Sequence, residues 1–161
     1  MVKNLFITIA NLVLAVFLLA CPLHAKGLEV SPPSYLWRVE ALGVKAEMPI
    51  PVKIINHSGR RRTFTLQAKT PAEINTKVDK GFEEIPDTAW VAFETAEVVV
   101  TPEDEKKVKV YVKIPKEKDN FGQWWMFYIE VKEKPPGGDR FALACYPKIY
   151  VATPLWRKGK M

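Results

Sequence analysis

Residue types that support catalysis or metal binding are scarce in this sequence, which contains two cysteines and two histidines among 161 residues. Cys21 and His24 lie in an N-terminal segment that we expect to be removed. Cys145 and His57 then remain, so no internal disulfide, no Cys–His pair and no metal-ligand spacing is available. We therefore expect no catalytic activity, no cofactor and no metal site, and a buried, inert thiol at Cys145.

Helical periodicity is also missing, because no window after residue 26 keeps apolar residues at helical spacing over ten residues. Carboxylates do cluster, at Glu83, Glu84 and Asp87 and again at residues 103–105. Both clusters lie in loops or turns, where acidic residues beside proline are common, so we interpret them as solvated and not as an acid–base pair. The triplet "NHS" at Asn56 is a formal glycosylation sequon, which we interpret as a hairpin turn.

The N-terminus has the three parts of a secretory signal peptide. "MVKN" carries one positive charge, "LFITIANLVLAVFLLA" is uncharged and apolar, and "CPLHA" supplies a proline and a small residue at Ala25. This pattern predicts a signal peptide over residues 1–25, and the run is short for a retained membrane anchor. Cleavage before Cys21, in the lipobox-like "LLAC", is the alternative, although Leu19 is not the usual small residue there. We expect a protein of the periplasm or cell surface, with membrane contact only if Cys21 is lipidated.

The charge of the chain is moderately positive, +6 over the whole sequence and one less without Lys3. Such a charge suits contact with anionic envelope polymers or acidic proteins without requiring it. No recognition-helix pattern is present, and an exported chain is an improbable partner for nucleic acid. The roughly 136 residues after the signal peptide are enough for one self-sufficient domain.

Three stretches alternate apolar and polar residues with a period of two, as strands with one buried face do. Their apolar members are Ile50, Val52 and Ile54; Phe64, Leu66 and Ala68; and Val108, Val110, Val112 and Ile114. Shorter strands are predicted at 28–30, 35–39, 90–93 and 97–100, and longer ones in "NFGQWWMFYIEV" and "FALACYPKIYV".

Turn-forming residues separate these segments, in "NHSGR", "TPEDE", "IPKEKDNFG" and "KPPGGD". Residues 70–87 form the longest irregular connection, with a short 3₁₀ turn expected at "PAEI". Seven or more short antiparallel strands in a domain of this size predict an all-β fold, a single immunoglobulin-like β-sandwich over residues 26–154. A basic tail is expected over residues 155–161.

The order "LEVSPP", "PIPVKIINHSG", "AWVAF", "VVVTPEDEKKVKVYVKIP", "GQWWMFYIEV" and "YPKIYVATP" resembles the PapD-like group of immunoglobulin folds. That group includes the N-terminal domains of periplasmic pilus chaperones and the peptidoglycan-binding domain of WxL-interacting surface proteins. In pilus chaperones an Arg and a Lys anchor a subunit's terminal carboxylate, and Lys148 falls at the Lys position. The Arg position falls near Pro33 or Ser34, where this chain has no cation, and we expect no second chaperone domain.

The strand "NFGQWWMFYIEV" is apolar on both faces, which raises the question of what its second face contacts. Trp125, Phe127, Ile129 and Val131 share one parity, and the matching inward set of the last strand is Phe141, Leu143, Cys145, Ile149 and Val151. The outward parity places Trp124, Met126 and Tyr128 beside Tyr146, Lys148 and Tyr150. Either the 70–87 connection or the tail with Trp156 covers this outer face, or it is an open interaction surface.

We predict that Trp124, Tyr128, Tyr146 and Tyr150, with Lys148 among them, contact a partner. Pro147 cannot donate to a ladder, so its strand is expected to be an edge or to be broken there. The predicted function is a non-catalytic, exported binding or assembly module of the cell envelope. Its partner is a protein or a cell-wall glycan such as peptidoglycan, bound through a sheet face or an edge strand. Two alternatives are a periplasmic chaperone-like protein that holds subunits by strand addition and a carbohydrate-binding accessory domain.

Overall fold

The computed structural model describes residues 27–135 and 142–156. The predicted signal peptide, Cys21, Phe141 and residues 157–161 of the predicted tail lie outside the described residues. Among the residues that are described, no helix is long and apolar enough to cross a membrane.

Three 3₁₀ turns, Ala72–Ile74, Thr88–Trp90 and Lys118–Asn120, accompany the strands in the described residues. The strands are β1 Leu28–Ser31, β2 Ser34–Arg38, β3 Ala46–Glu47, β4 Val52–Asn56, β5 Arg62–Lys69, β6 Glu83–Glu84, β7 Val91–Phe93, β8 Glu97–Val100, β9 Asp104–Val108, β10 Val110–Val112, β11 Trp124–Lys134, β12 Ala144–Cys145 and β13 Lys148–Ala152.

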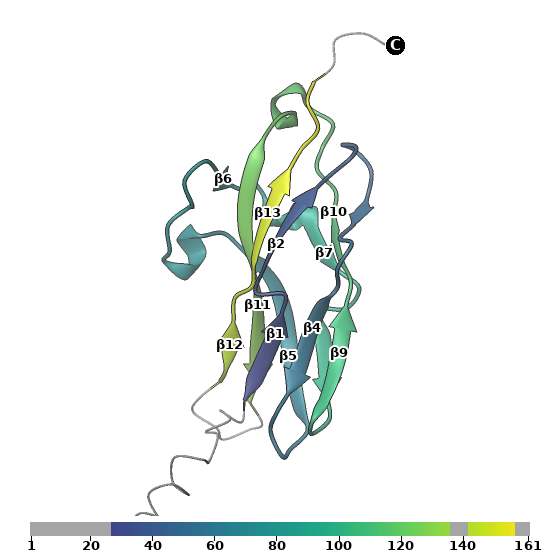
Figure 1. The fold of residues 1–161 in the computed structure, drawn as a ribbon, viewed down its shortest axis with the longest axis vertical. Helices are drawn as coiled ribbons and strands as arrows, with labels where there is room; N and C mark the ends of the chain where they lie inside the picture. The colour runs from purple at the N-terminus through teal and green to yellow at the C-terminus, as the bar shows by residue number, and fades with distance from the viewer. Residues whose placement is uncertain (1–26, 136–141, 157–161) are drawn as a thin grey trace, which may run out of the picture.

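The strands pack as two layers (Figure 1). One layer consists of two small sheets with the orders β1-β4-β9 and β3-β10-β7, which lie in line because β9 and β10 follow one another along the chain. The other layer is a seven-stranded sheet with the order β2-β13-β11-β5-β8, in which β12 and β6 also pair with β11. The all-β sandwich that the sequence predicted is therefore the fold of the described residues.

The beginning of the chain belongs to both layers. β1 pairs antiparallel with β4, and after a cis peptide bond between Ser31 and Pro32 the chain crosses to the other layer. There β2 pairs with β13 in parallel, with Ser34 opposite Lys148 and Arg38 opposite Ala152. β6 is also parallel to β11. The expectation of antiparallel strands was therefore wrong for these two pairs, because a strand's direction depends on contacts that local alternation does not encode.

The core lies between the layers and uses the parity that the sequence predicted. Trp125, Phe127, Ile129 and Val131 of β11 are buried, as are Ile149 and Val151 of β13. The apolar residues of β5 are buried, and so are Val108 in β9, the valines of β10 and Ile114 just beyond it. Apolar alternation located this core because a strand against a hydrophobic layer must place every second side chain inside.

Two residues that the alternation placed inside are exposed. Ile50 is 45% exposed and Leu143 is 42% exposed. Both lie outside the regular strands, since β4 begins at Val52 and β12 begins at Ala144. The period of two constrains a side chain only while the backbone stays extended in a ladder, so the prediction was wrong at both strand ends. Cys145 is half-buried, and partial burial raises the pKa of its thiol.

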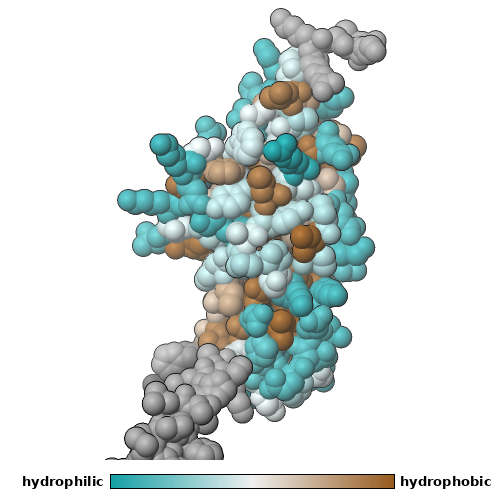
Figure 2. Space-filling model, viewed as in Figure 1, coloured by the Kyte–Doolittle hydropathy of each residue, from teal (hydrophilic) through white to brown (hydrophobic). Residues whose placement is uncertain are grey.

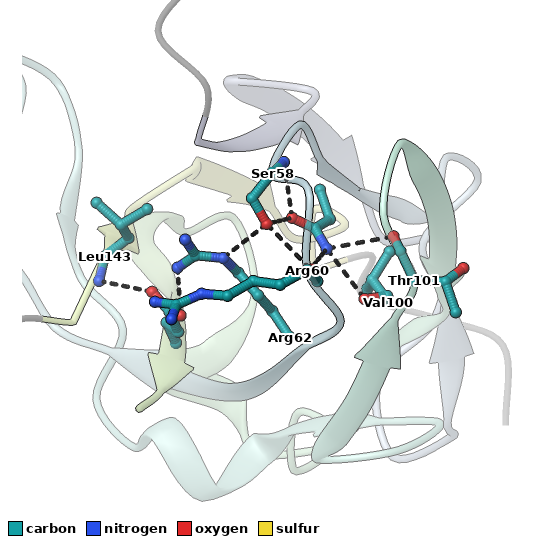
Figure 3. Close-up of polar contacts among 8 residues, drawn as sticks. Ser58, Arg60, Arg62, Val100, Thr101 and Leu143 are labelled. Atoms are coloured by element: carbon teal, nitrogen blue, oxygen red, sulfur yellow. Dashed lines mark hydrogen bonds and ion pairs between the residues drawn. The ribbon is translucent and has the colours of Figure 1, made fainter. Parts of the chain in front are cut away.

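The "NHS" triplet lies in the turn from β4 to β5, and this turn is held from inside. The hairpin interpretation was wrong, because β4 pairs with β1 and β9 whereas β5 pairs with β11 and β8, so the turn joins the two layers. The fully buried Asn56 amide donates to the backbone carbonyls of Arg60, Val100 and Thr101, and its oxygen accepts from Ser58. Figure 3 shows this network extending through the Arg62 side chain, whose Nε donates to Ser58 Oγ at 2.8 Å and whose Nη1 pairs with Glu133. The network joins the β4–β5 turn to the ends of β8 and β11.

Candidate binding face

The outer face of the seven-stranded sheet carries the residues that the sequence singled out, and the strand register fixes their rows. Tyr150 lies between Leu36 of β2 and Met126 of β11. One row away, Lys148 lies between Ser34 and Tyr128. Ala152 lies between Arg38 and Trp124 in the row on the other side. In these rows β13 lies between β2 and β11.

The segment between β5 and β6, residues 70–82, folds across the middle of the face and is called the strap here. It leaves β5 at Lys69, and β6 rejoins the sheet beside Trp125 and Met126 of β11. The Phe82 ring lies 4.5 Å from the Tyr150 ring and 5.8 Å from the Trp124 ring, measured between centroids. Met126 and Tyr128 are buried although their side chains point outward. Of the two covers that the sequence left open, the strap is the one that lies here.

A carboxylate anchors the strap to β13. Asp79 Oδ2 accepts a hydrogen bond from Lys148 Nζ at 2.8 Å and another from the Tyr150 hydroxyl. The Lys148 contact, followed by the Tyr150 contact, lowers the pKa of Asp79 below its usual range. The same hydrogen bond raises the pKa of Lys148, and the bond to Asp79 raises that of Tyr150. The cation that resembles a chaperone anchor is therefore paired with a carboxylate of its own chain.

A tight turn carries Asp79 and Phe82, the two side chains of the strap that contact the sheet. The Phe82 N–H donates to the Asp79 carbonyl at 3.1 Å, which closes a four-residue turn. Gly81 within it has a φ of +88°, a conformation that favours glycine. The stretch "DKGF" was a usable sequence signal for a turn, but it contained nothing that pointed to Lys148.

The remaining predicted residues fall at two ends of the face. Trp124 is exposed at one end. Tyr146 is exposed at the other, where its hydroxyl donates to Glu130 Oε1 at 2.9 Å and its pKa is raised mainly by that bond. The strap separates the two ends. The predicted residues share one face, but they do not form one continuous open patch. Trp156, the other possible cover, contacts Phe121 instead.

One continuous apolar surface does remain beside the strap. Leu36 and Trp124 are each 43% exposed. Tyr150, beside Leu36, and Phe82, against both Tyr150 and Trp124, connect them. We call these four residues the platform: Leu36, Phe82, Trp124 and Tyr150. In Figure 2 the surface over β2 and β13, at the front, carries brown apolar residues among pale and teal ones. The sequence analysis missed Leu36 because it lies in a short strand without apolar alternation. It missed Phe82 because that residue lies in a loop.

Away from the platform, a concavity of about 280 Å³ lies at the end of the sandwich that carries the β4–β5 turn. Its lining residues carry charges of both signs, and two of its cations are paired: Arg62 with Glu133 and Lys134 with Glu97. No group of three or more potential metal-ligating side chains occurs among the described residues.

Comparison with solved structures places this geometry in a known fold. The PapD-like domain 7 of human CEP192 superposes with a TM-score of 0.58 at 12% identity, covering 82% of this chain and 88% of that one. The E. coli chaperone DraB gives 0.55 at 11%, covering 80% and 55%. The Salmonella enterica SafA pilin in complex with the SafB chaperone gives 0.54 at 7%, covering 79% and 54%. No protein-family model and no curated protein matches.

Identities this low establish the fold alone. This chain spans most of the CEP192 domain but little more than half of the two other chains. The structures compared are described as chaperones, a pilin–chaperone complex and an ASH domain, and none of them is described as an enzyme. The chain therefore has the PapD-like immunoglobulin fold, as the order of its sequence motifs predicted.

Proposed function

We propose that this chain is a non-catalytic binding or assembly module of the cell envelope that holds a protein partner against the platform. The observation that carries the proposal is the exposure of Leu36 and Trp124 in one apolar surface that the Phe82 and Tyr150 rings connect. Tyrosine and tryptophan dominate the energetics of protein interfaces because a large apolar ring is buried at a small cost in side-chain entropy.

The platform is also held in place before binding. Phe82 is supported by two rings and by the turn at Gly81, while Tyr150 is hydrogen-bonded to Asp79. A surface that is already ordered loses less conformational freedom when a partner docks, which favours affinity. The strap therefore serves the proposed site by fixing its rings in addition to covering Tyr128.

A protein partner is favoured by what similar structures are described as holding. Two of them are a pilin bound to a chaperone and a chaperone–tip adhesin complex, so PapD-like chaperones bind protein subunits. Strand addition directly onto β13 is not favoured for this chain, because β13 already lies between β11 and β2 over Lys148–Ala152. Lys148 would accept a partner's carboxylate only in exchange for Asp79.

Export is part of the proposal and rests on the N-terminal sequence pattern. The expected mature chain begins at Lys26, or at a lipidated Cys21 in the alternative. Intact-mass analysis of the protein from its own cells distinguishes these two, and a retained Met1 would contradict both.

The binding site is tested by placing a photo-crosslinking amino acid at Trp124 in the living cell. The expected result is one discrete protein adduct, identified by mass spectrometry. The control position is Lys106, which is exposed on the opposite layer. The same adducts from both positions, or none from Trp124, would contradict the proposal. A glycan adduct would replace the protein partner with the carbohydrate alternative.

Substitution measures what the platform contributes once the partner is in hand. Trp124→Ala should weaken binding by about 2 kcal/mol or more, as at interface hot spots, while the melting transition stays in place. Val44→Ala is the matched control, since Val44 is an exposed apolar residue outside the platform. Tyr146→Ala should weaken binding less, because Tyr146 lies beyond the strap.

A further inference from the structure

β2 is an open edge of the seven-stranded sheet. It pairs with β13 on one side and is the terminal strand of the sheet order among the described residues. The ladder to β13 begins with the Lys148 N–H donating to the Pro33 carbonyl and ends with the Val39 N–H donating to the Ala152 carbonyl, both at 2.9 Å. Because the backbone groups of alternate residues point to opposite sides of a strand, those of Ser34, Leu36 and Arg38 point away from β13.

The same three residues carry the outward side chains of β2. Ser34, Leu36 and Arg38 are exposed, whereas Trp37 between them is buried in the core. Arg38 forms no ion pair within the described parts of the chain. Each of the three residues thus offers one N–H and one C=O at the edge and a side chain on the outer face. An edge of this kind is a template for a further strand.

We propose that a second copy of this chain pairs with β2 in antiparallel orientation, with Leu36 opposite Leu36 of the second copy. In this register the two leucines form a hydrogen-bonded pair on the two-fold axis. Ser34 of each copy lies opposite Arg38 of the other. A two-fold axis makes the contact closed, because the same patch serves both partners.

The neighbouring registers are worse on the side chains of β2 itself. A shift by two residues places Leu36 opposite Arg38 in one direction, which sets an apolar side chain beside a charge, and opposite Ser34 in the other, which leaves no apolar pair. A further shift in the first direction places Arg38 opposite Arg38, and like charges directly opposite each other destabilise a strand pair. The Leu36-centred register is the one that pairs apolar with apolar and separates the two arginines.

The pairing bears directly on the proposed function without depending on it. A two-fold axis perpendicular to the sheet leaves both outer faces on the same side, so the dimer presents two platforms next to each other. A partner with two copies of its binding segment would then be held at both sites, which raises the overall affinity.

The edge is five residues long and is preceded by Pro32 and Pro33, so the contact is small. We therefore expect a weak dimer whose population depends on concentration.

The proposal is tested by sedimentation velocity on the mature protein purified from its own cells. The protein concentration is varied between about 1 µM and 1 mM, the range in which dimers with small interfaces dissociate. The expected result is a reversible shift from monomer to dimer. Amide exchange at high concentration should slow at Leu36 but not at Trp37, whose N–H already faces β13. A protein that stays monomeric throughout overturns the proposal, whether or not Trp124 crosslinks to a partner.

Charge exchange at one position tests the register. Leu36→Glu alone and Leu36→Lys alone should each remain monomeric, because like charges then meet on the axis. An equal mixture of the two should recover a dimer, since opposite charges then face each other. Ile50→Glu is the matched control, as Ile50 is exposed to a similar degree away from β2. Dimers of Leu36→Glu alone, or monomers in the mixture despite unchanged melting, would overturn the register.

Discussion

Replacing Asn56 by alanine should destabilise this protein far more than its place in a surface turn suggests. The side chain is fully buried. Its amide donates to Arg60 O at 2.8 Å, Val100 O at 3.1 Å and Thr101 O at 3.2 Å. Its oxygen accepts from the Ser58 N–H at 3.1 Å and from the Ser58 hydroxyl at 2.6 Å. One side chain therefore holds the β4–β5 turn to the end of β8.

The magnitude follows from counting these bonds. Two amide hydrogens and two bonds to the oxygen give four ordinary hydrogen bonds, each worth about 1 kcal/mol net. The Val100 carbonyl would be left buried without this donor, which adds to the loss. We expect Asn56→Ala to lower the free energy of unfolding by about 3–5 kcal/mol. This is a large part of the stability of an ordinary domain, about 5–15 kcal/mol.

Urea unfolding followed by tryptophan fluorescence measures this loss, because Trp37 and Trp125 are buried and report on the core. His57→Ala is the control in the same turn. His57 forms an exposed pair with Glu29 at 2.8 Å, and such pairs contribute at most about 1 kcal/mol. A loss below about 1 kcal/mol for Asn56→Ala would refute the view that this network holds the turn.

An isosteric change separates the donors from the acceptor. Asn56→Asp keeps an oxygen for Ser58 but sets a carboxylate oxygen against three carbonyls. Burial and those carbonyls should raise the folded-state pKa of the new carboxyl above its unfolded value of about 3.9. The variant should therefore approach the wild type in stability as the pH falls through the raised pKa and the group becomes neutral. A stability gap that does not change with pH would argue against this arrangement.

Two further predictions test the core and the strap. Phe127→Ala should cost about 3–5 kcal/mol, and Lys109→Ala on the surface about 0.5 kcal/mol; equal losses in urea unfolding would show that the strand faces are assigned wrongly. Asp79 has a lowered pKa, so its contribution is present above the unfolded value near 3.9 and is lost as the pH falls through the folded value. Amide exchange in the strap, corrected for intrinsic pH dependence, should therefore rise in acid. The rise should be absent in Asp79→Asn, whose strap is already loosened, and a rise of equal size in both proteins would contradict the role of this carboxylate.

Local alternation was sufficient to predict most of the core. Phe64, Val110 and Phe127 were placed inside from their strand patterns, and all three are fully buried. Leu143 was not predicted correctly, because it lies just before β12, where the backbone no longer follows a ladder. Pro147 did mark a break, between β12 and β13, but it did not mark the free edge. That edge belongs to β2, a strand more than a hundred residues earlier in the chain.

The candidate site was predictable only in part, for a similar reason. The outward parity of Trp124, Tyr128 and Tyr150 was correct, but parity says which way a side chain points and not what lies above it. The cover comes from the strap, whose Asp79 meets Lys148 across 69 residues of sequence. Nothing in the local pattern around either residue encodes that contact.

The sequence by itself determined the period of the strands, the positions of the turns and hence the all-β sandwich, because these follow from short-range geometry and from the need to bury apolar side chains. The tertiary structure decided which outward residues stay exposed, which strand has an unpaired edge, and how Lys148 is neutralised. These outcomes depend on which distant segments lie side by side. Packing of the whole chain fixes those neighbours, while a strand pattern constrains only its own two faces.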